Sequence, residues 1–230
     1  MIHKIKMALT LHLGHNFNQA VNKLKLPQSL HTLVFGHRFN QPVDNLILPS
    51  NLHTLVFNRN FDQAVNKLVL PQSLHTLLFL GNFNHSVDRI VLPQNLHTLV
   101  FYGEFNQPVD KLLLPSSLHT FAIDGNFNQP VDELVLPPSL HTLAFHGVFN
   151  QSVDNLVLPQ SLHTLAFNGF FLKESMEFTL PLTLRFNDSE DSDGEENAFN
   201  QPIDKLILPP NLHILKLGNS FDQPCTFVNK

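Results

Sequence analysis

Histidines recur along this chain at one position of a repeating phrase, and they offer the first chemistry to consider. Each follows a leucine, as in "LHTL", and the eight are His31, His53, His75, His97, His119, His141, His163 and His213. Neutral imidazole is a common metal ligand, so a metal ladder is one interpretation. Metal–nitrogen bonds of about 2.0 Å need ring nitrogens that converge on one point. Side chains on parallel strands lie about 4.8 Å apart and do not converge. We therefore expect stacked imidazoles that hold no metal, and we expect no cofactor.

Six aspartates form a second row, in which carboxylates could act as catalytic acids or bases. They are Asp44, Asp88, Asp110, Asp132, Asp154 and Asp204. Like charges stacked on neighbouring strands are unfavourable unless something compensates them. The next position of the repeat carries a base in several units, such as Lys67 and Arg89, so solvated ion pairs and turn capping explain the row. No nucleophile, base and orienting group recur as a set, so we expect no catalytic residue and no enzyme.

An asparagine row favours a structural interpretation over a ligand site. A turn between parallel strands leaves backbone N–H and C=O groups unpaired, and a stacked amide can satisfy them in one coil after another. We expect the following asparagines to bind the backbone of the neighbouring repeat: Asn18, Asn40, Asn84, Asn106, Asn128, Asn150 and Asn200.

One segment departs from the repeating composition. The stretch "NDSEDSDGEEN" (187–197) holds six acidic residues and no basic one. Without it the formal charge of the chain changes from −5 to +1, which argues against an electrostatic footprint for nucleic acid. Its "DSDG" lacks the ligand pattern of a calcium loop. Low hydrophobicity and high charge predict a solvated loop.

All these rows arise because the chain repeats itself every 22 residues. Phe recurs at 17, 39, 61, 83, 105, 127 and 149; Phe171 continues the series, and Phe199 and Phe221 follow after a gap of 28. Such a period is typical of solenoids, in which each unit buries its apolar face against its neighbours. The predicted organisation is an N-terminal cap and partial repeat (1–16), seven repeats (17–170), an irregular repeat with the acidic loop (171–198), and a last repeat with a C-terminal cap (199–230).

Each unit is expected to contain two short strands. In the unit from Phe39, apolar residues alternate with others in "VDNLIL" (43–48) and "LHTLVF" (52–57), and Pro49 marks a turn between them. The alternation places Phe39, Val43, Leu46, Leu48, Leu52, Leu55 and Phe57 inward. The fold class is therefore an all-β repeat solenoid of about ten coils, whose two parallel β ladders enclose stacked Phe, Leu and Val rows. Where Ile123 replaces a Phe, Phe121 replaces a Leu two positions earlier, so both are expected inside.

The units resemble FNIP repeats, named for a phrase that reads "FNQP" at 39, 105, 127 and 199. The resemblance covers about residues 8–224, and "SLHTLVFGHRFN" (29–40) is similar to the leucine-rich-repeat pattern. It implies a leucine-rich-repeat-like solenoid of the kind seen in amoebal and giant-virus proteins. Family members often follow an F-box that docks to a ubiquitin ligase core, which implies a role in substrate recognition. About 16 residues precede the first unit here, so we expect no F-box.

Composition predicts a soluble, intracellular protein. The chain is 43% hydrophobic, enough for an extended core, and no apolar run is long enough for a signal peptide or a membrane helix. Its one cysteine, Cys225, excludes an internal disulfide and favours a reducing compartment. We expect a cytoplasmic location, in the host cytoplasm if the source is viral.

Function is expected where the repeats differ from each other. The outward positions of the "LHTLVF" strands vary, and the central coils present an apolar patch beside two polar residues. The predicted protein-binding residues are Leu78, Leu80, Val100, Tyr102, Asp124 and His146. The predicted function is a non-enzymatic scaffold that binds a protein partner through this face.

Self-assembly is the alternative function. Copies of the chain would associate as a homodimer through the ends of the ladders, or through a second apolar row on the other side of the coil. That row comprises Ile47, Val69, Val91, Leu113, Val135 and Val157.

Overall fold

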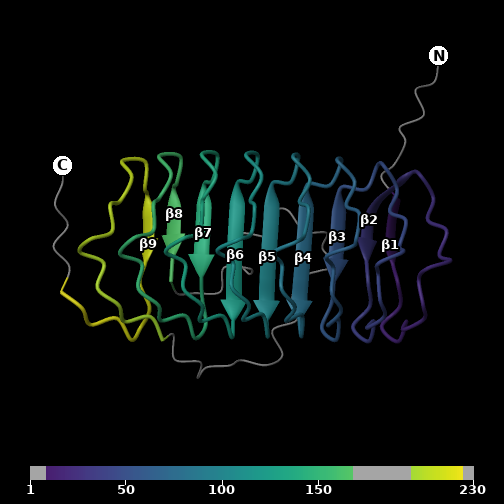
Figure 1. Ribbon diagram of the computed structural model, residues 1–230, viewed down its shortest axis with the longest axis horizontal. Coiled ribbons are helices and arrows are strands. Elements are labelled where there is room, and N and C mark those ends of the chain that lie inside the picture. The colour runs from purple at the N-terminus through teal and green to yellow at the C-terminus, as the bar shows by residue number, and fades with distance from the viewer. Residues whose placement is uncertain (1–8, 168–197, 225–230) are drawn as a thin grey trace, which may run out of the picture.

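The described part of the chain folds into a solenoid with one parallel β-sheet. The computed structural model describes residues 9–167 and 198–224. In these ranges nine strands lie side by side in chain order, from β1 at one end to β9 at the other (Figure 1). They are β1 (Leu9–His12), β2 (Leu30–Val34), β3 (Thr54–Phe57), β4 (Thr76–Gly81), β5 (Thr98–Gly103), β6 (Thr120–Gly125), β7 (Thr142–Phe145), β8 (Thr164–Ala166) and β9 (Ile214–Lys216). The same ranges contain no helix, and thus none long and apolar enough to cross a membrane.

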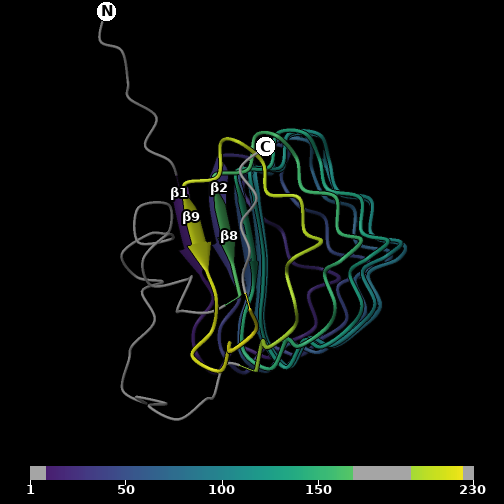
Figure 2. The same ribbon diagram turned by 90° about the vertical axis from the view of Figure 1, so that its left-hand side faces the viewer.

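Strict register stacks equivalent residues of successive repeats. Thr54 pairs with Thr76, Leu55 with Leu77 and Phe57 with Phe79, and the pattern continues along the sheet. Because every strand is parallel to the next, the chain must return around the coil to the same end of the sheet before it enters the next strand (Figure 2). Each row of identical residues in the sequence thus becomes a row in space.

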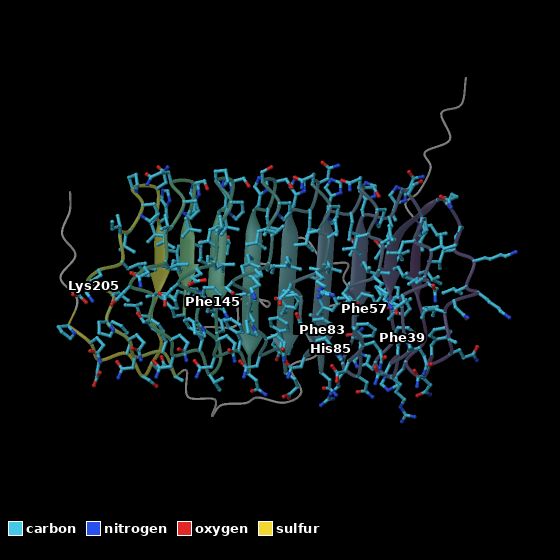
Figure 3. The ribbon with its side chains drawn as sticks, in the orientation of Figure 1. Phe39, Phe57, Phe83, His85, Phe145 and Lys205 are labelled. Atoms are coloured by element: carbon cyan, nitrogen blue, oxygen red, sulfur yellow. The ribbon has the colours of Figure 1, made fainter. Side chains whose placement is uncertain are left out.

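The core consists of stacked aromatic and aliphatic rows. Ring centroids are 5.9 Å apart between Phe39 and Phe61 and 5.1 Å apart between Phe35 and Phe57, with the rings nearly parallel. Stacked rings at this separation are favourable beyond their buried area. Figure 3 labels Phe39, Phe57, Phe83 and Phe145, which lie in these rows. The inward positions predicted for the unit from Phe39 are confirmed, because all are buried except Leu48, which is half-buried against the core.

The compensating exchange at Phe121 and Ile123 is also confirmed. Both side chains are fully buried in the core cluster. Because interiors are close-packed, the extra volume at one position accompanies the reduced volume at the other.

The all-β solenoid is confirmed, but the second β ladder is wrong. Residues 43–48 form no strand, and the sheet is the only one in the described ranges. Instead the N–H of Leu46 donates to the carbonyl oxygen of Val43 at 3.0 Å, which closes a tight turn. The inward residues Val43 and Leu46 are three positions apart, a spacing that suits a turn and does not suit the period of two in a strand. Asp44 and Asn45 between them are residue types that favour turns.

The irregular repeat predicted at 171–198, with its acidic loop at 187–197, lies outside the described residues except for Ala198. The flanking coils, however, stack directly on each other. Strand β8 pairs with β9, and the rings of Phe149 and Phe199 are 6.0 Å apart. Equivalent residues across this junction are 50 positions apart, where other neighbours are 22 apart. No coil therefore separates Phe149 from Phe199. Phe171, which continues the Phe series in the sequence, lies outside the described residues.

Glycines end the central strands because the neighbouring coil leaves no room for a side chain. Gly81, Gly103 and Gly125 have φ values of +130°, +101° and +100°, in the region that other residues rarely adopt. A Cβ atom on Gly103 would also lie 2.5 Å from the carbonyl oxygen of Gly81. Both the backbone conformation and the close approach of the coils therefore require glycine.

We expect Gly103→Ala to lower the free energy of unfolding by about 1–3 kcal/mol, because it adds a steric overlap to a strained backbone. Gly14→Ala is the matched control, since a Cβ there meets no atom within 4 Å. Urea unfolding of both variants measures the difference. Equal losses from the two substitutions would contradict the role assigned to the glycine row.

Candidate functional site

The histidine row is stacked as expected. The rings of His75 and His97 have centroids 4.9 Å apart, and the remaining neighbouring pairs lie within 4.9–5.2 Å. In most of these residues Nδ1 lies close to the carbonyl oxygen two residues earlier, at 2.6 Å for His75. A carbonyl oxygen only accepts, so Nδ1 carries the hydrogen and the ring is fixed parallel to its neighbours. No group of three or more His, Cys, Asp or Glu side chains in residues 9–167 and 198–224 is placed to hold a metal.

The asparagine row binds the neighbouring coil, which confirms its structural role. Asn106 Oδ1 accepts from the backbone N–H of Asn128 at 3.0 Å and from Gln129 Nε2 at 2.9 Å. The same pair of bonds recurs along the solenoid and also crosses from Asn150 to Asn200 and Gln201. In one coil Asp62 replaces the asparagine, and its Oδ1 accepts from the N–H of Asn84 at 3.1 Å. The position therefore supplies an acceptor oxygen.

The aspartate row includes ion pairs to the next coil. Lys205 Nζ is 2.8 Å from Asp154 Oδ2, and Lys67 Nζ is 3.6 Å from Asp44 Oδ2. The hydrogen bond to Asp154 raises the pKa of Lys205, whose side chain is exposed. Such exposed pairs add little stability. This arrangement fits the predicted charge pairing.

The predicted binding residues of the sheet share one face. Leu80 pairs with Tyr102 and Tyr102 with Asp124 in the register of β4, β5 and β6. His146 follows β7, and its Nδ1 is 3.5 Å from Asp124 Oδ2. Two residues earlier in the same strands, Leu78 pairs with Val100. The structure therefore brings all six residues together, and we call them the sheet-face patch.

Burial limits what the sheet-face patch can bind in this structure. Leu78 and Val100 are 0% exposed, Leu80 7% and His146 3%, so these four are buried. The three aliphatic residues among them belong to a second apolar cluster, separate from the core: Val34, Val56, Leu78, Leu80, Val100, Ala122, Ala144 and Ala166. Tyr102, at 36%, is the exposed member. Partner binding through this patch stays a prediction.

Large apolar side chains are most exposed on the opposite side of the coil. Seven of them are 77–83% exposed at one position of successive repeats. They are Ile47, Val69, Val91, Leu113, Val135, Val157 and Ile207, and we call this row the apolar ridge. Each follows a residue of the Leu46 row, whose buried side chains anchor the segment in the core. The ridge lies on the segments that connect the strands on the side away from the sheet (Figure 2).

Sequence reasoning found six of these seven residues as a second apolar row and missed Ile207. The 50-residue spacing between Asn150 and Asn200 applies equally to Val157 and Ile207, so Ile207 continues the ridge directly. A search limited to 22-residue steps cannot find it. Aligning "VDNLVLP" (153–159) with "IDKLILP" (203–209) would have found it.

The first coils contain one histidine with a shifted pKa. The rings of His15 and His37 are stacked with centroids 4.9 Å apart. Burial lowers the pKa of His37, and the nearby charges of His15 and Arg59 lower it further.

We expect Asn106→Ala to cost about 1–3 kcal/mol, because it removes the acceptor of a part-buried N–H. Asn106→Asp should cost less, since Asp62 already fills the equivalent position. Urea unfolding of the two variants tests this expectation. Equal destabilisation by both would show that the position does not act through its acceptor oxygen.

The shifted pKa of His37 predicts a loss of stability in acid. The unfolded chain binds more protons than the folded chain near the unfolded pKa of about 6.5, so the free energy of unfolding should fall as the pH drops through that value. His37→Gln should reduce this pH dependence in melting experiments at roughly pH 7.5 and 5.5. A variant that loses as much stability as the wild type would exclude His37 as a source.

Comparison with solved structures finds a match to CroV588, a giant-virus protein whose crystal structure is described as "a novel circular LRR protein structure". The sequences are 38% identical and the TM-score is 0.75. The match covers 94% of this chain and 28% of CroV588, so the chain spans less than a third of that protein. The likeness confirms the leucine-rich-repeat-like fold. Comparison with curated proteins found no significant match.

The family comparison matches coils on both sides of the segment that separates Phe167 from Ala198. The model of the FNIP Repeat matches residues 39–82, 83–122, 127–170 and 199–228. These segments cover more than half of the chain and include the coils on both sides of the 50-residue step. The chain belongs to the FNIP repeat family.

Proposed function

We propose that this protein is a non-enzymatic interaction scaffold that binds a protein partner through the apolar ridge. Repeat solenoids resembling leucine-rich-repeat proteins are generally scaffolds for protein interactions. The observation that supports this particular surface is the exposure of its seven aliphatic side chains, 77–83% each. Most other apolar residues of the repeat are buried, in the core or in the apolar cluster of the sheet face.

The ridge is a continuous row, because its members occupy one position of successive stacked coils. Single exposed apolar residues are normal, whereas a contiguous apolar row is typical of an interaction site. Burying one Val, Leu or Ile side chain contributes about 1.5–3 kcal/mol, so a partner that covers several of them gains substantial affinity. Central members such as Val91, Leu113 and Val135 are expected to dominate, because binding energy concentrates where water is fully excluded.

The sheet-face patch is a second candidate surface. Tyr102 combines apolar area with a hydroxyl, a combination favoured at interfaces, and the pair of Asp124 and His146 lies one and two strands away. Because its aliphatic members are buried, this patch offers a partner less apolar area than the ridge does. We therefore favour the ridge over the sheet-face patch as the surface that binds a partner.

Two finer expectations remain predictions. Substrate recognition linked to ubiquitin ligases is implied by the family resemblance, and binding through the ridge does not depend on it.

Homodimerisation through the solenoid ends would use the outer strands β1 and β9. A contact between the same edge of two copies closes as a dimer, whereas a contact of β1 with β9 continues from copy to copy.

Site-specific photo-crosslinking tests which surface binds. We expect a photoactivatable amino acid at position 113, irradiated in a cell lysate, to form a protein adduct, and Val91→Ser with Val135→Ser to abolish it. A photoactivatable residue at position 148 is the control, since Val148 is 43% exposed and lies off the ridge. An adduct at position 102, with none at 113, would overturn the ridge in favour of the sheet-face patch.

A further inference from the structure

We propose that the partner of the apolar ridge is a second copy of this chain, bound in antiparallel fashion about a two-fold axis that passes Leu113. The inference rests on the proposed function of the ridge and specifies its partner. An axis that runs across the ridge reverses the order of the coils in the second copy. It also keeps the same flank of the ridge facing itself, as isologous contacts do.

The order of residues in the ridge favours this symmetry. Read along the solenoid, the row is Ile, Val, Val, Leu, Val, Val, Ile, the same in both directions. An antiparallel copy centred on Leu113 therefore places Ile47 opposite Ile207. By the same symmetry Val69 lies opposite Val157, and Val91 opposite Val135. Leu113, the largest of the central residues and 83% exposed, lies opposite itself.

The spacing of the ridge also favours a second copy. Its side chains follow the separation of stacked coils, about 4.8 Å, over seven consecutive coils. One face of a helix presents a side chain about every 5.4 Å, so over the six steps of the ridge a helix falls about 3.6 Å out of step. A second solenoid of the same repeat places one aliphatic side chain opposite every member.

Charges beside the ridge distinguish the antiparallel from the parallel arrangement. The residue two positions before each ridge member is exposed, and in the coils of Val91 and Val135 it is Arg89 and Glu133. The two-fold axis brings Arg89 of one copy to Glu133 of the other, and does so twice. The coils of Val69 and Val157 bring Lys67 to Asn155, without like charges. Among the residues two positions before the ridge, only Lys111 meets its own copy, at the axis, where the long side chain can extend into solvent.

The area is sufficient for a stable dimer. Burying a Val, Leu or Ile side chain removes roughly 60–120 Å² of apolar surface from water, so the seven side chains remove about 400–800 Å² per copy. The flanking polar residues add to this area. The sum approaches the roughly 800 Å² per partner of a standard-size interface.

Analytical ultracentrifugation of the purified chain measures the assembly. We expect a closed monomer–dimer equilibrium in the wild type, and Leu113→Asp to raise the dissociation constant by about 100-fold or more, since it places two buried charges against each other. Val148→Asp, an exposed apolar position off the ridge, should leave it unchanged. Melting temperatures of both variants should match the wild type, because neither residue packs in the core.

Charge reversal tests the direction of the second copy. Arg89→Glu and Glu133→Arg should each raise the dissociation constant by about tenfold, because each creates like-charge contacts. The double variant should restore wild-type association, since it exchanges the partners of both pairs. Single variants that dimerise as the wild type does, or a double variant that fails to recover, would overturn the antiparallel arrangement.

Cysteine crosslinking locates the copies independently, in a Cys225→Ser background that removes the one native cysteine. A short bifunctional maleimide should join Val69→Cys chains to Val157→Cys chains. It should not join Val69→Cys chains to each other, because an antiparallel dimer separates those positions by about four coils, or roughly 19 Å. The opposite pattern would show parallel copies and overturn the proposal.

The remaining outcomes separate this inference from the proposed function. A wild-type monomer, together with an adduct of another protein at position 113, would overturn the dimer and retain the ridge as a docking surface. A monomer without any adduct at 113 would overturn both. Dimers insensitive to Leu113→Asp, or growth into open-ended oligomers, would assign the association to the solenoid ends and overturn the proposal.

Discussion

Register between parallel strands is the constraint on which the rest of this structure depends. Once Thr54 lies opposite Thr76, every residue of a coil lies next to its counterpart in the neighbouring coil. Any interaction made once is then offered again in the next coil. An aromatic ring meets an aromatic ring, an amide oxygen meets a backbone N–H, and a glycine meets a carbonyl oxygen that excludes any larger residue.

Register also explains which residues are free to vary. Asn106 and Gly103 satisfy or avoid backbone groups of the next coil, so their types recur wherever that backbone geometry recurs. The backbone of the next coil does not require one residue type at positions 102, 124 and 146, and these residues differ from coil to coil. The apolar ridge differs from these rows because it recurs although its side chains are 77–83% exposed and lie outside the core cluster. An external contact is the physical explanation we favour.

Much of the fold followed from the sequence because the repeat samples each environment many times. Eight histidines at one position indicate a stack, and the exchange at Phe121 and Ile123 shows that two positions share one interior. The second ladder could not be predicted from alternation alone, because Val43 and Leu46 obey the spacing of a turn. Periodicity assigned Leu78 and Val100 to the outer face of the sheet, as the register confirms, but it could not reveal that they are buried there. Which side of a strand a residue occupies is a local property, whereas its exposure depends on what packs against that side.

The two apolar sides of the coil differ: the sheet face is buried within the protein, whereas the ridge is exposed and, as we propose, is covered only by association. Hydroxyl-radical footprinting across a dilution series measures both sides in one experiment. We predict that Leu78 and Val100 stay protected at every concentration, while Leu113 and Ile47 react in dilute samples and become protected as the concentration rises. Strong labelling of Leu78 and Val100, with labelling of Leu113 that does not change with concentration, would contradict the account.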